Sequence, residues 1–169
     1  MPKITLVDYD SAWPERYSGL EREIRELLGP AALQIEHVGS TSVPGLIAKP
    51  IIDIVLVVVD SAREEAYVPA LETAGYTLDI REPDWFEHRY LCGRDGDVNL
   101  HVFSAGCSEV ERMVRFRDRL RSDPADRERY AAEKRELASR QWPDVQDYAD
   151  AKTGVISEIC GPSASERTD

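Results

Sequence analysis

The chain has 169 residues, of which 42% are hydrophobic and 31% charged, and its formal net charge at pH 7 is −11. This length and composition fit one globular domain with a core of its own. The acidic balance argues against generic binding to nucleic acid or to anionic membranes, since both rely on basic surfaces. It still allows a local basic cluster that binds a small anion. We therefore expect neither a membrane nor nucleic acid as a partner, and the oligomeric state stays open.

Three features of the sequence concern the compartment of the protein. The longest apolar run, residues 54–59, is far too short to span a bilayer. The first residues, "MPKITLVDYDSAW", lack the apolar region of a signal peptide. The cysteines are odd in number and have no CxxC spacing, which indicates neither a disulfide framework nor a cysteine zinc site; they are Cys92, Cys107 and Cys160. We expect a cytoplasmic protein with reduced thiols.

In the first half of the chain, hydrophobic periodicity and turn residues predict helix, strand, strand, helix. Apolar residues recur at spacings of three and four residues up to Leu28, and Pro14 suits the first turn of a helix. Ser61 and Glu64 have the spacing of a capping box, and Gly75 suits a helix end. The predicted elements are a helix over 11–28, a strand over 33–38, a "GSTS" turn, a loop over 43–50, a strand over 51–59 and a helix over 61–75.

The second half predicts strands in a hairpin and then helices. Asp95-Gly96 is a strong hairpin signal between two alternating segments. The predicted elements are strands over 76–80, 88–92 and 98–103, a helix from Ser108 with Glu111 as its capping-box partner, a helix from Asp123-Pro124, and a last helix carrying Tyr148, Lys152, Val155, Ile156 and Ile159. We expect an α/β (α+β) fold, a mixed sheet flanked by helices with a helical C-terminal cap, in a single domain over 1–161. Residues 162–169 are expected to be a disordered tail.

The strand over 51–59 is apolar on both faces and yet contains Asp53. A strand of this kind needs cover on both sides, so we expect it to be internal in the sheet. A lone buried carboxylate costs several kcal/mol or more unless it is paired, protonated or metal-bound. Asp53 follows the Gly39-Ser40 turn by a short loop. Such a turn offers N–H and hydroxyl donors to phosphates, and a carboxylate on the adjacent strand can hold Mg²⁺.

Six segments in order, "HVGSTSVPGL", "AKPIIDI", "LHV", "FRDRLR", "YAAEKREL" and "YADAK", resemble the GrpB family of small bacterial proteins. The resemblance runs from about Val7 to Ile159. It implies the nucleotidyltransferase fold, in which a Gly-Ser turn precedes a strand bearing Asp-x-Asp/Glu, and a related domain is fused to some dephospho-CoA kinases. The resemblance leaves the biochemical activity undefined. This chain departs from the pattern because Val55 stands where the second carboxylate is expected.

The segment "VNLHVF" supplies the remaining candidates for a site beside Asp53. It places Asn99 and His101 on one face of its strand. We predict Asp53 and His101 as catalytic residues that converge beneath the turn, and Asp53, His101 and His37 as metal ligands. The fold suits Mg²⁺ or Mn²⁺, whereas an Asp/His set also suits Zn²⁺ or Fe²⁺. Neutral His101 as a general base, or as an ordinary core histidine, is the alternative.

For phosphate binding we predict residues from the turn and from neighbouring basic positions: Gly39, Ser40, Thr41, Ser42, Lys49, Arg89, Arg117, Tyr130 and Lys134. Lys49 is either a phosphate clamp or the ion-pair partner of Asp53. The predicted function is binding of a nucleotide or a phosphorylated small molecule with a divalent metal, in a nucleotidyl or phosphoryl transferase. The alternative is a catalytically inactive binding module linked to coenzyme A metabolism.

Overall fold

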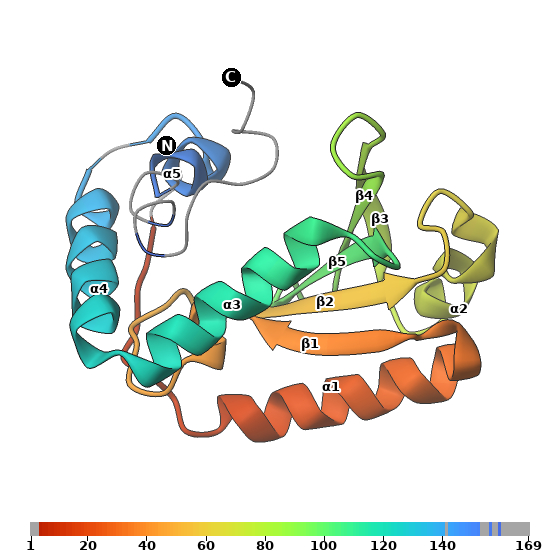
Figure 1. Cartoon of the computed structure of the whole chain (residues 1–169), viewed down its shortest axis with the longest axis horizontal. Coiled ribbons are helices and arrows are strands. Elements are labelled where there is room, and N and C mark those ends of the chain that lie inside the picture. The colour runs from red at the N-terminus through yellow and green to blue at the C-terminus, as the bar shows by residue number, and fades with distance from the viewer. Residues whose placement is uncertain (1–3, 141, 153–155, 157–158, 160–169) are drawn as a thin grey trace.

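A computed structural model of the chain describes residues 4–140, 142–152, 156 and 159. Its helices are α1 (Trp13–Leu28), α2 (Val68–Glu72), α3 (Ser108–Ser122), α4 (Pro124–Ala138) and α5 (Val145–Ala151), and its strands are β1 (Gln34–Val38), β2 (Ile52–Val58), β3 (Thr77–Glu82), β4 (His88–Cys92) and β5 (Val98–Ser104) (Figure 1). The predicted α/β architecture, with a mixed sheet, flanking helices and helices at the C-terminal end, is confirmed. Within the described residues, no helix combines the length and apolar character that a membrane crossing needs.

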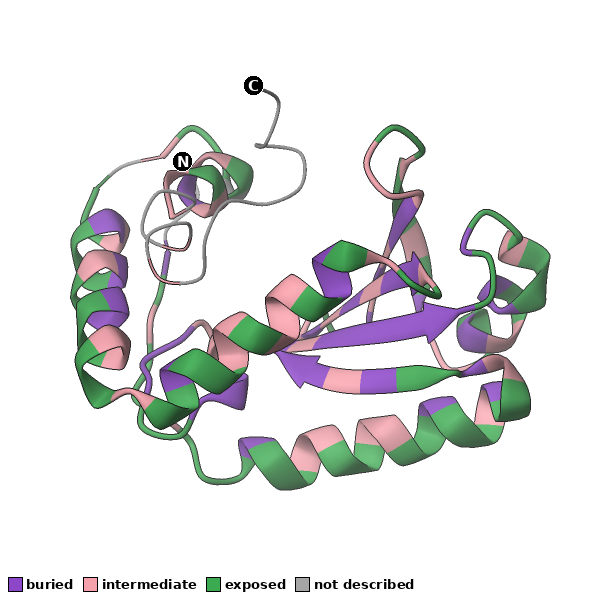
Figure 2. Cartoon of the chain, in the orientation of Figure 1, coloured by how far each residue is buried: buried purple, intermediate pink, exposed green. Residues whose placement is uncertain are grey.

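The five strands form one mixed sheet in the order β1-β2-β5-β4-β3. β2 pairs antiparallel with β1 and parallel with β5, while β4 pairs antiparallel with both β5 and β3. β2 is therefore internal, as its apolar sequence predicts. In Figure 2 this strand is the most continuously buried segment in view.

Helices cover both faces of the sheet near β2. Ile52, Ile54 and Leu56 face the main core, which they share with α1 and α2. Val55 and Val57 point to the other face, against Phe103 of β5 and Val110 of α3. α4 packs beyond the N-terminal end of β2, where its apolar residues meet the loop that follows the "GSTS" turn (Figure 1). The polar site described below lies on the α3 side of the sheet.

The capping boxes predicted at two helices do not form. Ser61 donates its hydroxyl to the carbonyl of Glu87, and Glu64 forms ion pairs with Arg81 and Arg89. The expected long helix is consequently only a 3-10 turn followed by the short α2. Ser108 is the first residue of α3 rather than its cap. In contrast, α4 starts where a helix is predicted, and Asp123 caps it by accepting hydrogen bonds from two backbone amides of the first turn.

The predicted alternation of β3 is interrupted. A register shift between Leu78 and Ile80 lets Leu78 pack against the main core while Ile80 lines the pocket on the opposite face. In the last predicted helix, Tyr148 lies in α5, whereas Val155 and the predicted tail, 162–169, lie outside the described residues.

Candidate functional site

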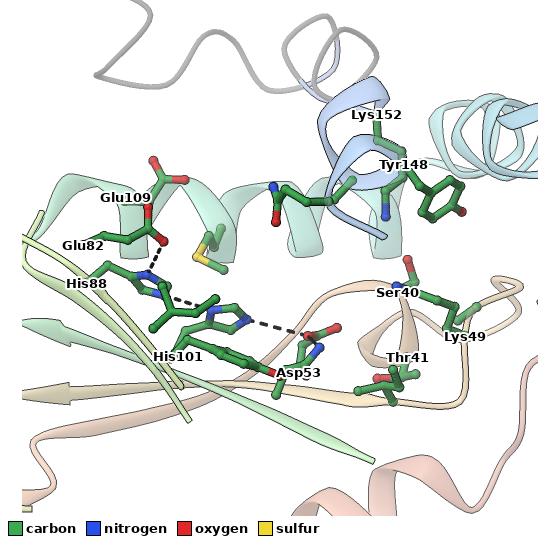
Figure 3. Close-up of a pocket in the computed structure, with 18 of the residues that line it drawn as sticks. Ser40, Thr41, Lys49, Asp53, Glu82, His88, His101, Glu109, Tyr148 and Lys152 are labelled. Atoms are coloured by element: carbon green, nitrogen blue, oxygen red, sulfur yellow. Dashed lines mark hydrogen bonds and ion pairs between the residues drawn. The ribbon is translucent and has the colours of Figure 1, made fainter. Parts of the chain in front are cut away.

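A pocket of about 620 Å³ lies between the α3-side face of the sheet, the turn that carries Ser40 and Thr41, and helices α3, α4 and α5 (Figure 3). The strands supply its polar floor because alternate residues of neighbouring strands point to the same face. These floor residues are Asp53, Glu82, His88, Tyr90, Asn99 and His101. Cationic side chains gather at the end of the pocket nearest the turn.

Asp53 lies at the centre of the site and interacts with the neighbouring strand β5. Asn99 Nδ2 donates to Asp53 Oδ1 at 3.0 Å, and His101 Nε2 lies 3.7 Å from the same oxygen. Tyr90 in turn donates its hydroxyl to Asn99 Oδ1 at 2.7 Å, which fixes the amide. Burial raises the pKa of the Asp53 carboxyl, but the interactions with His101, when that ring is protonated, and with Asn99 outweigh it and lower that pKa overall. The expected convergence of Asp53 and His101 on neighbouring strands is met.

The Gly39-Ser40 turn sits directly against this carboxylate. Gly39 has φ of 73° and ψ of −176°, a backbone conformation essentially restricted to glycine. A Cβ atom added to Gly39 would lie 2.5 Å from Asp53 Oδ2. Glycine at this position therefore does two things: it adopts the backbone conformation of the turn, and it leaves room for the side chain of Asp53. Figure 3 shows Asp53 between His101 on one side and Ser40 and Thr41 on the other.

A chain of hydrogen bonds extends from His101 to the edge of the pocket. His101 Nδ1 lies 3.0 Å from His88 Nε2, and His88 Nδ1 lies 3.0 Å from Glu82 Oε1. The rings of Trp85 and Phe103 pack against His88, with centroids 5.0 and 4.9 Å away. This burial lowers the pKa of His88 to about 3, so its imidazole is neutral at neutral pH. Glu82 and this role of His88 are not predicted from the sequence, although the alternation of strand 88–92 places His88 and Tyr90 on one face.

Lysines line the cationic end of the pocket. The chain contains four lysines among its 21 basic Lys and Arg residues, and the three in the part that the structure describes, Lys49, Lys134 and Lys152, all line this pocket. Lys134 is 2% exposed and donates to Ser40 Oγ at 2.6 Å and to the carbonyl of Ile47 at 2.8 Å. Burial, followed by repulsion from Lys152, lowers the pKa of Lys134 to about 6.

The other two lysines stand over one aromatic ring. Lys152 Nζ lies 4.6 Å and Lys49 Nζ 5.6 Å from the centroid of Tyr148. Burial, with repulsion from Lys49, lowers the pKa of Lys152 to about 8. Lys152 is not among the predicted site residues, because nothing in the periodicity of the last helix relates it to the turn. Tyr130 lies beneath the site, with its ring centroid 5.5 Å from Lys134 Nζ.

Four predicted site residues lie elsewhere. His37 points to the opposite face of the sheet, where it stacks on Tyr17 at 4.7 Å and contacts Thr41 Oγ1 at 2.9 Å, so it does not join Asp53 and His101. Arg89, next to His88 on the strand, also points to that face and pairs with Glu64. Ser42 and Arg117 line a separate cavity on the far side of the turn, and Arg117 bonds Glu36 and the carbonyl of His37.

The donor set does not fit a divalent metal held by the protein. Among the residues that the structure describes, no group of three His, Cys, Asp or Glu side chains converges on one point. Asp53 and His101 give two side-chain ligands, fewer than protein sites for Zn²⁺ use. A Mg²⁺ or Mn²⁺ ion at this point would need waters and ligand phosphates to complete its coordination. Val55 is fully buried in an apolar cluster. The lysines beside Asp53 further disfavour a metal cation there, because like charges repel.

Comparisons with known proteins agree on one family. The model of the GrpB protein family matches residues 3–161. UPF0157 protein BH1888 of Halalkalibacterium halodurans is 62% identical over 92% of this chain and 80% of its own length. The crystal structure of the conserved protein GrpB from Enterococcus faecalis superimposes with a TM-score of 0.76 at 27% identity, over 91% of this chain and 98% of that one.

A further relative is a longer protein. The dephospho-CoA kinase of Mycolicibacterium paratuberculosis is 29% identical over 88% of this chain, which spans only 43% of the kinase. Together with the family match over residues 3–161, these similarities cover the strands, the turn and the helices that enclose the pocket. The chain belongs to the GrpB family.

Proposed function

We propose that the pocket binds a phosphate-bearing small molecule, with a nucleotide as the favoured class, and that Lys134, Lys152 and Ser40 hold its phosphate. The observation that carries the proposal is the gathering of three of the four lysines around one pocket in a chain of net charge −11. A lysine ammonium binds phosphate as a compact point charge. Nearly all other cations of the chain are arginines, so this gathering is a specific feature of the pocket.

The lysines take the place of a protein-held metal in this proposal. In the nucleotidyltransferase pattern that the family resembles, paired carboxylates hold Mg²⁺ next to the phosphates. Here one carboxylate, Asp53, lies beside buried lysines, which neutralise phosphate charge directly when they are protonated. We therefore expect binding to persist in EDTA, and any Mg²⁺ or Mn²⁺ to arrive with the ligand. With Asp53 and His101 adjoining the phosphate position, phosphoryl or nucleotidyl transfer is the reaction class that this arrangement favours.

Ligand binding should be coupled to proton uptake. Because burial lowers the pKa of Lys134 to about 6 and that of Lys152 to about 8, Lys134 is largely neutral at pH 7.5 in the free protein. A bound phosphate favours the charged form of an adjacent amine and raises its pKa. Binding at pH 7.5 therefore takes up protons. Calorimetric titration in buffers of different ionisation enthalpy measures the number of protons taken up on binding.

The decisive experiment is a thermal-unfolding screen against nucleoside triphosphates and pyrophosphate, each with EDTA and with Mg²⁺ or Mn²⁺. A ligand at about one hundred times its Kd adds about 2.7 kcal/mol to the free energy of unfolding. We expect stabilisation in EDTA that is lost in Lys134→Met and Lys152→Met. Arg135→Met, which removes an exposed charge from the same helix α4, should retain it. The absence of stabilisation by every probe, or equal stabilisation of Lys134→Met, would refute the proposal.

A second candidate function rests on the dephospho-CoA kinase relative, in which a domain like this chain makes up less than half of the protein. We propose as the alternative a binding module that acts in coenzyme A metabolism without catalysis of its own. Dephospho-CoA and coenzyme A belong in the same screen. Stabilisation by these two compounds alone favours the module, whereas turnover of a nucleotide that is lost in Asp53→Asn excludes it.

A further inference from the structure

The hydrogen-bond chain Glu82–His88–His101 ends at the pocket, beside Asp53 (Figure 3). We propose that Glu82 and His88 fix the tautomer of His101, so that His101 Nε2 carries a lone pair and forms, with Asp53, a pair of proton acceptors for the bound ligand. Glu82 and His88 are positioning residues in this view, and His101 is the group that contacts the ligand. The identity of the ligand rests on the proposed function, whereas the tautomer does not.

The positions of the protons follow from the distances. The carboxylate of Glu82 accepts hydrogen bonds, so His88 Nδ1 at 3.0 Å carries the proton of that hydrogen bond. Neutral His88 then has a lone pair on Nε2. That lone pair accepts a hydrogen bond from His101 Nδ1, also at 3.0 Å.

The Asp53 side of His101 offers no competing bond of similar quality. The separation of His101 Nε2 from Asp53 Oδ1, 3.7 Å, is too long for a hydrogen bond, and Asp53 Oδ1 already accepts from Asn99 at 3.0 Å. A reversed tautomer would gain only this long contact and would place a lone pair of His88 against the carboxylate of Glu82. The chain of two short bonds therefore fixes the proton on Nδ1 of His101.

This arrangement restricts the chemistry of the ligand at that point. A lone pair and a carboxylate oxygen 3.7 Å apart repel each other unless a donor binds to each of them. An ammonium or a nucleophilic water can donate to both atoms, and two neighbouring hydroxyls can donate to one each. The inferred ligand is therefore a phosphorylated molecule with neighbouring hydroxyls or an amino group near its phosphate, and His101 Nε2 is the atom that accepts a proton from this part of the ligand.

Nitrogen NMR of the full chain labelled with ¹⁵N in its histidines tests the tautomer without any ligand. The chain has only three histidines, so His37→Gln and His101→Gln assign the signals. At pH 7.5 we expect Nδ1 protonated and Nε2 unprotonated in both His88 and His101. A His101 signal with Nε2 protonated, or with both nitrogens protonated, would overturn the proposal.

Two matched variants test the role of Glu82. Glu82→Ala removes the acceptor of His88 Nδ1, so the Nε2 signals of both rings should shift towards the protonated range as the tautomers mix. Glu87→Ala removes a carboxylate of equal exposure, 43%, that pairs with Arg89 instead of a histidine, and should leave both rings unchanged. Unchanged amide spectra elsewhere establish that each variant is folded. Identical histidine spectra in Glu82→Ala and the parent chain would refute the role of Glu82.

Glycerol 3-phosphate and propyl phosphate test the ligand inference, because they share the phosphate and differ in the hydroxyls. One added hydrogen bond predicts roughly two- to tenfold tighter binding of glycerol 3-phosphate. The difference should vanish in His101→Gln. Equal binding of the two compounds by the parent chain would overturn the ligand inference. If neither compound binds, the proposed phosphate site fails, while the histidine spectra still decide the tautomer separately.

Discussion

At the residue scale, the site depends on the close approach of Gly39 to Asp53. The carboxylate occupies the space where any other residue at position 39 would place its Cβ atom. The same contact presses Asp53 toward Asn99 and His101 on β5. Because Gly39 has no side chain, the turn can lie directly against Asp53, and Asp53 in turn interacts with the strand β5 of the pocket floor.

Gly39→Ala should therefore lower the free energy of unfolding by more than the strain of its backbone conformation alone would. Gly45 provides the matched control, because its φ is also positive, at 83°, but a Cβ atom there would meet nothing within 4 Å. Gly45→Ala should lower the free energy of unfolding by about 1–2 kcal/mol. Gly39→Ala should cost roughly 1–3 kcal/mol beyond that, through displacement of Asp53. Urea unfolding of both variants measures the difference, and equal costs would show that the close approach does not matter.

Residue patterns in the sequence located part of this site. Asp53 stood out as a charge in an apolar strand, and the alternation of "VNLHVF" put Asn99 and His101 on one face; both inferences need only the two-residue period of a strand. Lys152 and Glu82 escaped because their positions depend on tertiary packing of α5 and on the register of β3. His37 was misplaced for a related reason, since one residue of strand register decides the face.

At the element scale, the internal position of β2 was predictable from its composition, whereas the ends of helices were less so. Tertiary partners took both side chains of one predicted capping box: Ser61 donates to the carbonyl of Glu87, and Glu64 pairs with two arginines. The register shift in β3 likewise has no clear signal in an alternating segment. Local patterns therefore predicted which elements form and left their boundaries to packing.

The α3-side face of β2 distinguishes this protein from a carboxylate-rich metal site. Val55 is fully buried against Phe103 and Val110, so Val55→Asp would place an unpaired charge in an apolar cluster. We expect a loss of roughly 3–5 kcal/mol in the free energy of unfolding. Val55→Thr, of nearly the same shape, should cost about 1–3 kcal/mol. Urea unfolding with and without Mg²⁺ is the test, and recovery of stability by Mg²⁺ in Val55→Asp would contradict our description of the site.

At the scale of the whole molecule, two effects of pH oppose each other. The net charge of −11 at pH 7 falls in magnitude as the pH approaches the pI of about 4.8, which reduces self-repulsion. Against this, His37 and His88 are buried and neutral, only 6% and 4% exposed. Burial lowers their pKa values to about 4 and about 3. In the unfolded chain both titrate near 6.5.

We expect the histidines to dominate, so that stability falls as the pH falls. Because the pKa values of His37 and His88 are lowered on folding, their contribution is complete above pH 6.5 and is lost progressively below it, at a limit of about 1.4 kcal/mol per pH unit for each ring. Carboxylates take over only at lower pH: the ion pairs of Glu64 lower its pKa to about 2, so its contribution is lost below about pH 4.5. Folding also lowers the pKa of Lys134, to about 6, so this lysine contributes to the slope until the folded chain has protonated it. The window from about pH 5.5 to 4.5 therefore isolates the histidines.

Urea unfolding at steps between pH 7 and pH 4.5 measures this slope, and His37→Gln tests its origin. Glutamine can keep a hydrogen bond to Thr41, and position 37 lies outside the pocket, on the opposite face of the sheet. In this variant the slope of the unfolding free energy against pH should fall by the equivalent of about one proton. His88 is then the one histidine of the two that still takes up a proton on unfolding in this window. An increase in stability as the pH approaches 4.8 would mean that relief of charge repulsion exceeds the cost of burying the two neutral rings.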